Sequence, residues 1–229
     1  MQLPWSAHAG IPAGWIGVDM HVHTRHSDAM PKVDTVLDRA RRRGIGVAIT
    51  DHNTIGGAGE ACTKARDIIV IPGIEVSSDQ NVHMLFYFDR VSDLESFYLR
   101  FIEPHLRRRW YCKSIAMPAE EILSAAREFP SFSALAHPFG NGHFRHMAEE
   151  LRQSVLALID GIEVCNGVQS HRRNTKALEL AKCCNLPHLG GSDAHVACAC
   201  GHVCTFAPGD DASSFLQSLH CGVSAVLAY

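Results

Sequence analysis

Residues 16–50 read IGVDMHVHTRHSDAMPKVDTVLDRARRRGIGVAIT, and this stretch decides the fold class. An apolar run of strand length opens it (16–22), and a second one closes it (45–50). Between them, residues 33–44 repeat apolar side chains at helical spacing and end on Gly44, a common helix terminator. A strand, a helix and another strand in this order predict a βαβ unit with parallel strands.

The same alternation continues to the end of the chain. Nearly continuous apolar strands separated by helices predict a parallel sheet with helices outside. Seven or more such units without a glycine-rich dinucleotide motif favour a barrel over an open sheet, and 229 residues fit one domain (1–229). Residues 89–117 are the least regular. They begin with a helical pattern that is expected to stop near Pro104, and they are predicted to be an insertion beside the open face. The remaining strands are expected at 68–76, 82–88, 132–137, 160–166, 186–193, 202–206 and 223–228, and the remaining helices at 118–129, 172–185 and 210–222.

Composition excludes several classes of protein. A net charge of −3 supplies no electrostatic footprint for nucleic acid, and no apolar run approaches the ~18 residues that span a bilayer. The N-terminal segment lacks a basic start followed by a long apolar run, so we expect no signal peptide.

Nine cysteines without a framework spacing indicate free thiols in a reducing cytoplasm. An extra zinc site at Cys198, Cys200 and Cys204 stays open, although their spacing is not that of a zinc finger.

Polar side chains lie at the end of the first predicted strand, at a spacing that suits metal ligands. His21 and His23 are two residues apart, so on a strand they point the same way and can bind one ion together. Asp19 shares their face and is a candidate partner for their imidazoles. A lone histidine in an apolar strand is usually a hydrogen-bonded core residue, but a pair followed by Asp28 favours metal ligands.

Other strands also carry candidate ligands at their ends. In a parallel barrel the carboxyl ends of the strands meet at one rim, where barrel active sites are built. Six histidines and three carboxylates at one rim exceed the needs of a single tetrahedral ion, so we expect two or three ions with a bridging carboxylate. The nine candidates are His21, His23, Asp28, His52, Glu75, His83, His137, Asp193 and His195.

The ordered motifs resemble those of the PHP (polymerase and histidinol phosphatase) family of metal-dependent phosphoesterases, from about residue 17 onward. They are H-x-H at 21–23, S-D at 27–28, T-D-H at 50–52, G-I-E at 73–75, His83, A-H-P at 136–138 and G-S-D-A-H at 191–195. The resemblance implies an α/β fold, a distorted TIM-like (β/α)7 barrel with the metal site at the C-terminal rim of its strands.

The resemblance also implies how the nine residues are shared among three ions. His21, His23, Glu75 and Asp193 would hold the first ion. Glu75 would bridge to a second, completed by His83 and His137, and Asp28, His52 and His195 would hold the third. The start DMHVHT differs from the D-Y-H-x-H-T of histidinol phosphatases, which argues against that substrate. GIEV occurs again at 161–164, and we interpret Glu163 as a structural or supporting carboxylate.

Clustered divalent ions suit phosphoester hydrolysis, so we expect a metal-bridging hydroxide to attack the phosphorus of a small phosphorylated substrate. Imidazole and carboxylate ligands are compatible with Zn, Mn or Fe. Asp51 is expected to orient a ligand imidazole, and Arg145 or Arg172 to clamp the phosphate, with a plain surface arginine as the alternative for both. The competing hypotheses are a 3′–5′ exonuclease, an amidohydrolase and a metal-binding regulatory module. The sequence predicts no oligomeric state.

Overall fold

The structure is a computed structural model that describes residues 11–65, 67–108, 113–142 and 144–229. Nine strands form its main sheet, in the order β11-β10-β1-β2-β3-β4-β7-β8-β9. Their bounds are β1 Trp15–Val22, β2 Gly46–Ile49, β3 Val70–Ser77, β4 His83–Phe88, β7 Ser131–Leu135, β8 Gly161–Asn166, β9 His188–Gly191, β10 Val203–Pro208 and β11 Ala225–Ala228.

The end of β9 returns to β1 and nearly closes the sheet. The backbone N–H of Asp193 donates to the carbonyl of His21 at 2.7 Å, and the N–H of His23 donates to the carbonyl of Ala194 at 3.1 Å. Seven strands (β1, β2, β3, β4, β7, β8 and β9) therefore make a barrel, while β10 and β11 extend it as antiparallel strands beside β1. The predicted fold class, an α/β barrel, is confirmed.

One strand runs against the predicted direction. β4 pairs antiparallel with both β3 and β7, whereas the other barrel pairs within the sheet are parallel. The physical reason is the short turn 78–82, because a parallel connection needs a crossover of a dozen or more residues. The reversal matters for the site, since it places the first residue of β4, His83, opposite Ser77 at the carboxyl end of β3.

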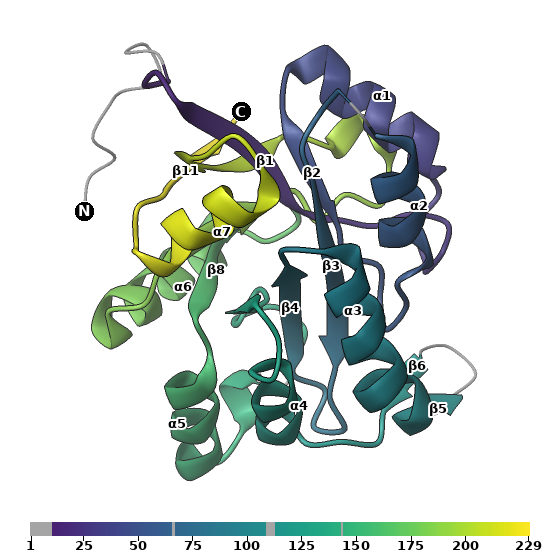
Figure 1. Cartoon of the computed structure of the whole chain (residues 1–229). Coiled ribbons are helices and arrows are strands. Elements are labelled where there is room, and N and C mark those ends of the chain that lie inside the picture. Colours follow the sequence, from purple (N-terminus) through teal and green to yellow (C-terminus); the bar gives the residue numbers. More distant parts are fainter. Residues whose placement is uncertain (1–10, 66, 109–112, 143) are drawn as a thin grey trace.

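Helices cover the outside of the barrel (Figure 1). α1 buries its apolar face and ends where Gly44 adopts a left-handed conformation with φ 66°. α7 packs its buried Phe215, Leu216 and Leu219 into the same apolar cluster as Val18 and Met20 of β1. The helices are α1 Val33–Arg43, α2 Gly56–Lys64, α3 Val91–Phe97, α4 Ala119–Ala126, α5 Glu149–Leu158, α6 His171–Cys184 and α7 Ala212–His220, with short turns η3 Phe144–His146 and η4 Ala197–Ala199.

The irregular segment 89–117 begins as the expected helix and then changes character. α3 continues into a π-helical turn η1 (Tyr98–Ile102) and a 3₁₀ turn η2 (Glu103–His105), followed by the short strands β5 (Leu106–Arg108) and β6 (Lys113–Ile115). Residues 109–112 lie outside the described part of the chain, as do residues 1–10, where a signal peptide was not expected. The end of the segment reaches the β3–β4 turn, because the N–H of Asp79 donates to the carbonyl of Met117 at 3.1 Å.

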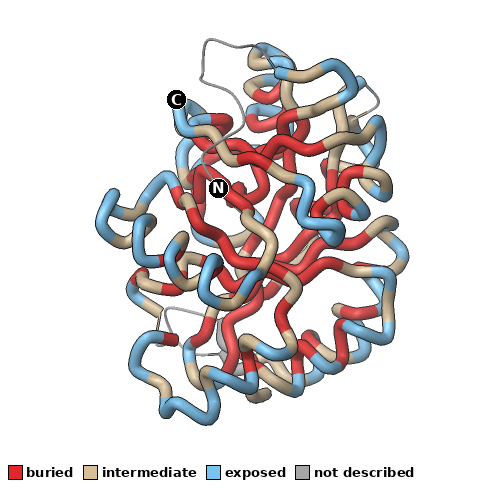
Figure 2. Tube along the Cα trace, turned by 90° about the vertical axis from the view of Figure 1, so that its left-hand side faces the viewer, coloured by how far each residue is buried: buried red, intermediate tan, exposed pale blue. Residues whose placement is uncertain are grey.

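Burial follows the strands. Figure 2 shows the buried trace running through the middle of the molecule and the exposed segments around it. Polar side chains are buried in the same interior, among them Asp19, His21, His23, Glu75 and Glu163. Because a buried charge is costly unless it is paired, these residues must satisfy one another or bind an ion. No helix within the described residues has the length and apolar character needed to cross a bilayer.

Candidate metal centre

Glu75 lies at the centre of the polar cluster. Its side chain is fully buried on β3, and both of its oxygens face imidazole nitrogens. Oε2 lies 3.2 Å from His21 Nε2, 3.3 Å from His23 Nε2 and 3.0 Å from His52 Nδ1, while Oε1 lies 2.8 Å from His83 Nδ1 and 3.1 Å from His137 Nε2. One carboxylate therefore contacts five of the six predicted histidines.

Two more carboxylates complete the cluster. Asp193 Oδ1 lies 3.1 Å from His23 Nε2 and 3.7 Å from His195 Nδ1. Asp28 Oδ2 lies 3.4 Å from His195 Nε2 and 3.7 Å from His52 Nε2. The structure thus brings all nine predicted residues together at one end of the barrel, although they come from β1, β3 and β4 and from the loops that follow β1, β2, β7 and β9.

Four overlapping groups in this cluster could hold a metal ion, with ligand atoms that all lie within 4.8 Å of one another. They overlap with the three sets implied by the family resemblance, but His23 also joins the outer set and His52 also faces Glu75. The assignment of ligands to particular ions stays a prediction. The groups are His23, Asp28, His52 and His195; His21, His137 and Asp193; His21, His23 and Glu75; and His52, Glu75 and His83.

The donor chemistry fits divalent metal ions. Imidazole and carboxylate groups are the ligands of Zn, Mn and Fe, and the Nδ1 atoms of His23 and His137 are buried with no hydrogen-bond partner in the described structure. Burial lowers the pKa of His52 to about 4, so its ring is neutral at pH 7. Burial opposes ionisation of Glu75, but the surrounding imidazoles of His52 and His21 hold its pKa well below the usual range.

Asp51 differs from its expected role. Its Oδ1 accepts hydrogen bonds from the backbone N–H of Thr24 at 2.7 Å and from Ser27 Oγ at 2.6 Å, and its Oδ2 accepts from Thr24 Oγ1 at 2.7 Å. The carboxylate therefore holds the loop that carries Asp28 rather than orienting an imidazole. The reason is that the chain turns back after His23, which brings this loop over the end of β2.

Asp19 also contacts the backbone instead of an imidazole. Its carboxylate accepts from the N–H of Ser192 at 2.8 Å and from the N–H of Gly201 at 2.7 Å. Burial raises its pKa to about 6. Asp19 therefore ties β1 to the segment after β9, next to Asp193.

Glu163 on β8 lies directly behind the cluster. It is buried, its Oε1 accepts from His21 Nδ1 at 2.9 Å, and its Oε2 accepts from the backbone N–H of His137 at 2.8 Å. This contact agrees with a supporting role. Asn166, three residues later, completes the same hydrogen-bond network. It was not predicted from the sequence, because no motif marks it.

The two candidate phosphate-binding arginines are exposed. Arg145 lies in η3 and donates its Nε to Nε2 of the adjacent His146 at 2.9 Å, while Arg172 lies in the first turn of α6, after β8. Among the described residues, neither arginine forms a hydrogen bond or an ion pair with a candidate ligand. Their phosphate-binding role stays a prediction.

The cysteine cluster does not join a metal site. Cys200 and Cys204 are buried and Cys198 is exposed, and burial raises the pKa of both buried thiols. Within the described part of the chain, the groups able to hold an ion contain no cysteine. A second zinc site at these residues is therefore not supported.

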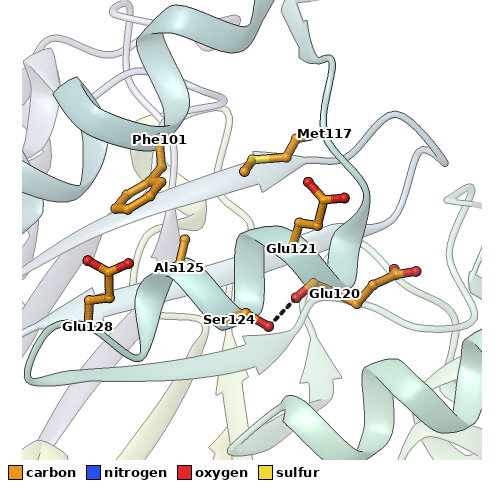
Figure 3. A pocket seen from close by; sticks show the side chains of 7 residues that line it. All are labelled: Phe101, Met117, Glu120, Glu121, Ser124, Ala125 and Glu128. Carbon is orange, nitrogen blue, oxygen red and sulfur yellow. Dashed lines mark hydrogen bonds between the residues drawn. The ribbon is translucent and has the colours of Figure 1, made fainter.

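A surface cleft of about 370 Å³ lies elsewhere, between η1 and α4. Figure 3 shows Phe101 and Met117 above Ala125, with the hydroxyl of Ser124 bonded to the carbonyl of Glu120. None of the residues that line this cleft is a candidate ligand. The candidate ligands lie instead at the barrel rim. The lining residues are Phe101, Met117, Glu120, Glu121, Ser124, Ala125 and Glu128.

Comparison with characterised proteins gives partial likenesses. A segment of 69 residues is 39% identical to a 3′,5′-nucleoside bisphosphate phosphatase of Chromobacterium violaceum, and the match spans 29% of this chain and 24% of that protein. A two-domain protein from Bacteroides vulgatus, described as containing a predicted PHP-like metal-dependent phosphoesterase, is similar with a TM-score of 0.71 and 17% identity. That likeness covers 94% of this chain and 65% of the other.

The lesion-specific endonuclease Q of Pyrococcus furiosus is also similar, with a TM-score of 0.71 and 17% identity over 90% of this chain and 56% of the enzyme. At these identities the structural likenesses show the fold. The family models carry the assignment: the PHP domain matches residues 19–164, well over half of the chain, and the PHP-associated region matches residues 171–224. The chain therefore belongs to the PHP domain family.

Proposed function

We propose that this chain hydrolyses a phosphoester of a small molecule, a monoester or a diester, with three divalent ions held by the nine rim residues. The observation that carries the proposal is the position of Glu75. Its Oε2 faces His21, His23 and His52, and its Oε1 faces His83 and His137, so one carboxylate can serve two ions. Divalent ions bound there would activate water and neutralise charge on the phosphoryl group.

The exposure of the ligands indicates the direction of substrate approach. The side chains of His21, His23 and Glu75 are 0% exposed, whereas those of Asp28 and His195 are 54% and 40% exposed. Asp28 and His195 therefore form the outer wall of the centre. A phosphoryl group would enter on this side and meet the inner residues only through the ions.

The substrate is proposed to be small. The bisphosphate phosphatase relative makes nucleoside bisphosphates the first compounds to test, although it is matched over only 24% of its length. Arg145 and Arg172 are the proposed phosphate clamp, because a guanidinium can bind a phosphate with two parallel hydrogen bonds. Free cysteines among the described residues accord with a cytoplasmic protein, which we propose as its location.

A second candidate is the cleavage of a phosphodiester in nucleic acid. The fold likeness to endonuclease Q favours it, since a related structure of that enzyme contains a 27-mer duplex with an abasic lesion at the active site. The net charge of −3 counts against it, because nucleic-acid affinity depends on cationic side chains along the phosphate backbone.

The decisive experiment uses the full chain. It would be stripped of metal and reloaded separately with Zn, Mn or Fe, and its metal content would be measured. The same preparation would be assayed on nucleoside bisphosphates, sugar phosphates, an aryl phosphodiester, labelled single-stranded DNA and a duplex with an abasic site. Turnover of the small compounds, lost in His21→Ala and Asp193→Asn, is expected.

Cleavage of DNA alone would favour the second candidate. Both candidates would be overturned if the metal-loaded protein cleaves no compound of the panel and if His21→Ala and Asp193→Asn behave like the wild type. Binding of ions without turnover would instead identify a metal-binding regulatory module.

A further inference from the structure

Glu163 and Asn166 form a buried pair behind three candidate ligands. The Nδ2 group of Asn166 donates to Glu163 Oε2 at 3.1 Å and to Asp193 Oδ2 at 3.1 Å. Glu163 in turn accepts from His21 Nδ1 at 2.9 Å and from the backbone N–H of His137 at 2.8 Å. The pair on β8 thus links candidate ligands of β1, of the loop after β7 and of the loop after β9.

Two of these ligands have a backbone conformation that needs support. His137 has φ 27° and Asp193 has φ 52°, and both values lie in the left-handed region that residues with a Cβ rarely adopt. Such a conformation costs free energy and persists only where the surroundings determine it. The Glu163 carboxylate holds the backbone of His137, and the Asn166 amide holds the side chain of Asp193.

The third ligand, His21, is held in one tautomer by Glu163. Glu163 is an acceptor, so His21 Nδ1 must carry the hydrogen that it donates. The lone pair of a neutral His21 ring then lies on Nε2, which faces Glu75 Oε2 at 3.2 Å and Asp193 Oδ1 at 3.5 Å. The ring is presented to the centre by the correct nitrogen.

The orientation of the Asn166 amide is also determined. Its Oδ1 accepts from the N–H of Val168 at 2.9 Å, which leaves Nδ2 for the two carboxylates. Asn174 of α6 fixes the backbone on both sides, since its Oδ1 accepts from the Asn166 N–H at 3.2 Å and its Nδ2 donates to the Asn166 carbonyl at 3.0 Å. An amide is therefore required at position 166.

We propose that Glu163 and Asn166 are positioning residues for the candidate ligands His21, His137 and Asp193, which form one of the groups able to hold an ion. They set the tautomer of the first, the backbone of the second and the carboxylate of the third. The inference rests on the metal centre of the proposed function and not on the identity of its substrate.

Isosteric substitutions test each partner. In Glu163→Gln, the new amide must face either His21 Nδ1 or the two donors that reach Oε2, so one set of hydrogen bonds is lost. In Asn166→Asp, a carboxylate faces the carboxylates of Glu163 and Asp193 and repels both. The matched control is Asp160→Asn, because Asp160 precedes β8 at its other end and accepts from the backbone N–H and hydroxyl of Ser133 at 2.8 Å and 2.6 Å.

The experiment uses the full chain, freed of metal and titrated with Co²⁺. Bound ions are counted by elemental analysis, the visible absorption of Co²⁺ reports its coordination, and thermal unfolding is recorded with and without Co²⁺. Without metal, we expect both variants to fold but to unfold at a lower temperature than the wild type, because buried hydrogen bonds are lost. We also expect them to bind one class of Co²⁺ roughly 10- to 100-fold more weakly and with an altered spectrum. Asp160→Asn should keep the wild-type affinity and spectrum.

Wild-type Co²⁺ affinity and spectrum in both variants would overturn the inference, and so would an equal loss in Asp160→Asn. A variant that does not fold is replaced by the other, since each substitution perturbs the pair from a different side. The readout is separate from hydrolysis. If the wild type binds Co²⁺ but cleaves no phosphoester, the proposed function fails while the positioning role is still measured.

Discussion

The Nε2 atoms of His21 and His23 lie 3.0 Å apart, and both face Oε2 of Glu75. Two imidazole nitrogens this close, buried and directed at the same carboxylate, need a proton or a cation between them. Their spacing on β1 places them on one face, and the return of β9 beside β1 adds Asp193 to the pair. The inner half of the centre is therefore assembled where the barrel closes.

Glu75→Gln should remove the shared ligand of the centre. An amide is a poor metal ligand and cannot bridge two ions, so we expect bound metal to fall below the wild-type stoichiometry and turnover to fall by more than roughly 100-fold, beyond the usual effect of an outer hydrogen-bond partner. Elemental analysis and phosphoester assays on one preparation measure both. Glu179→Gln, an exposed position on α6, is the control. Full metal content in Glu75→Gln would contradict the bridging role.

Metal affinity should rise with pH at the outer ligands. The hydrogen bond to Asp28 raises the pKa of His195 to about 9, so in the metal-free protein this ring is protonated at pH 7 and must lose its proton to bind an ion. We expect the apparent Co²⁺ affinity to increase up to about pH 9 and then to level off. His52, with a pKa of about 4, requires no such step.

The stability of the metal-free protein should follow the opposite trend. Because the pKa of His195 is higher in the folded state than its usual 6.5, its contribution is fully present below pH 6.5 and is lost as the pH rises through 9. Thermal unfolding of metal-free protein from pH 6 to pH 9.5 measures this change. In His195→Ala, both the Co²⁺ affinity and the stability of the metal-free protein should depend less on pH. An unchanged pH dependence in that variant would show that another group titrates.

Two glycines of α2 give a matched stability test. A Cβ at Gly57 would collide with Asp51 Oδ2 and lie 2.8 Å from Thr24 Oγ1, whereas a Cβ at Gly59 meets nothing within 4 Å. We expect Gly57→Ala to lower the free energy of unfolding by about 1–3 kcal/mol and to disturb the loop that carries Asp28. Gly59→Ala should raise it by up to about 1 kcal/mol, because alanine is the better helix former. Denaturant unfolding measures both, and equal effects would contradict the role of Asp51.

The phosphate clamp is tested by charge and geometry. If Arg145 or Arg172 binds the phosphate with two hydrogen bonds, its replacement by lysine should raise KM roughly tenfold or more while metal content stays constant, because lysine keeps the charge but loses the planar fork. The control is Arg42→Lys, an exposed arginine at the end of α1. Steady-state kinetics on the best substrate of the panel would assign the arginine, and unchanged KM in both variants would exclude the clamp.

Several features of the barrel could be predicted from local pattern. Apolar runs of strand length alternate with helical patterns, and the predicted strands and helices lie within a few residues of the observed ones, as at β1, α1 and β8, whereas the helices α2 and α5 were not predicted. The direction of β4 was not predicted, because the apolar pattern of a strand does not indicate whether it runs parallel or antiparallel to its neighbours. Only the length of the turn 78–82 distinguishes a hairpin from a crossover. The helix predicted to stop near Pro104 changes to a π-helical turn after Phe97.

By itself the sequence determined the chemical types in the centre and the β/α alternation, because ligand identity and periodicity are properties of the chain order. The nine candidate ligands, which the structure brings together, were chosen on that basis. Only the tertiary structure decided that Asp51 holds a loop, that Asp19 ties β1 to the segment after β9, and that Asn166 reaches Glu163 and Asp193. These roles depend on which atoms meet across strands far apart in sequence, and such contacts are set by barrel closure and register rather than by local pattern.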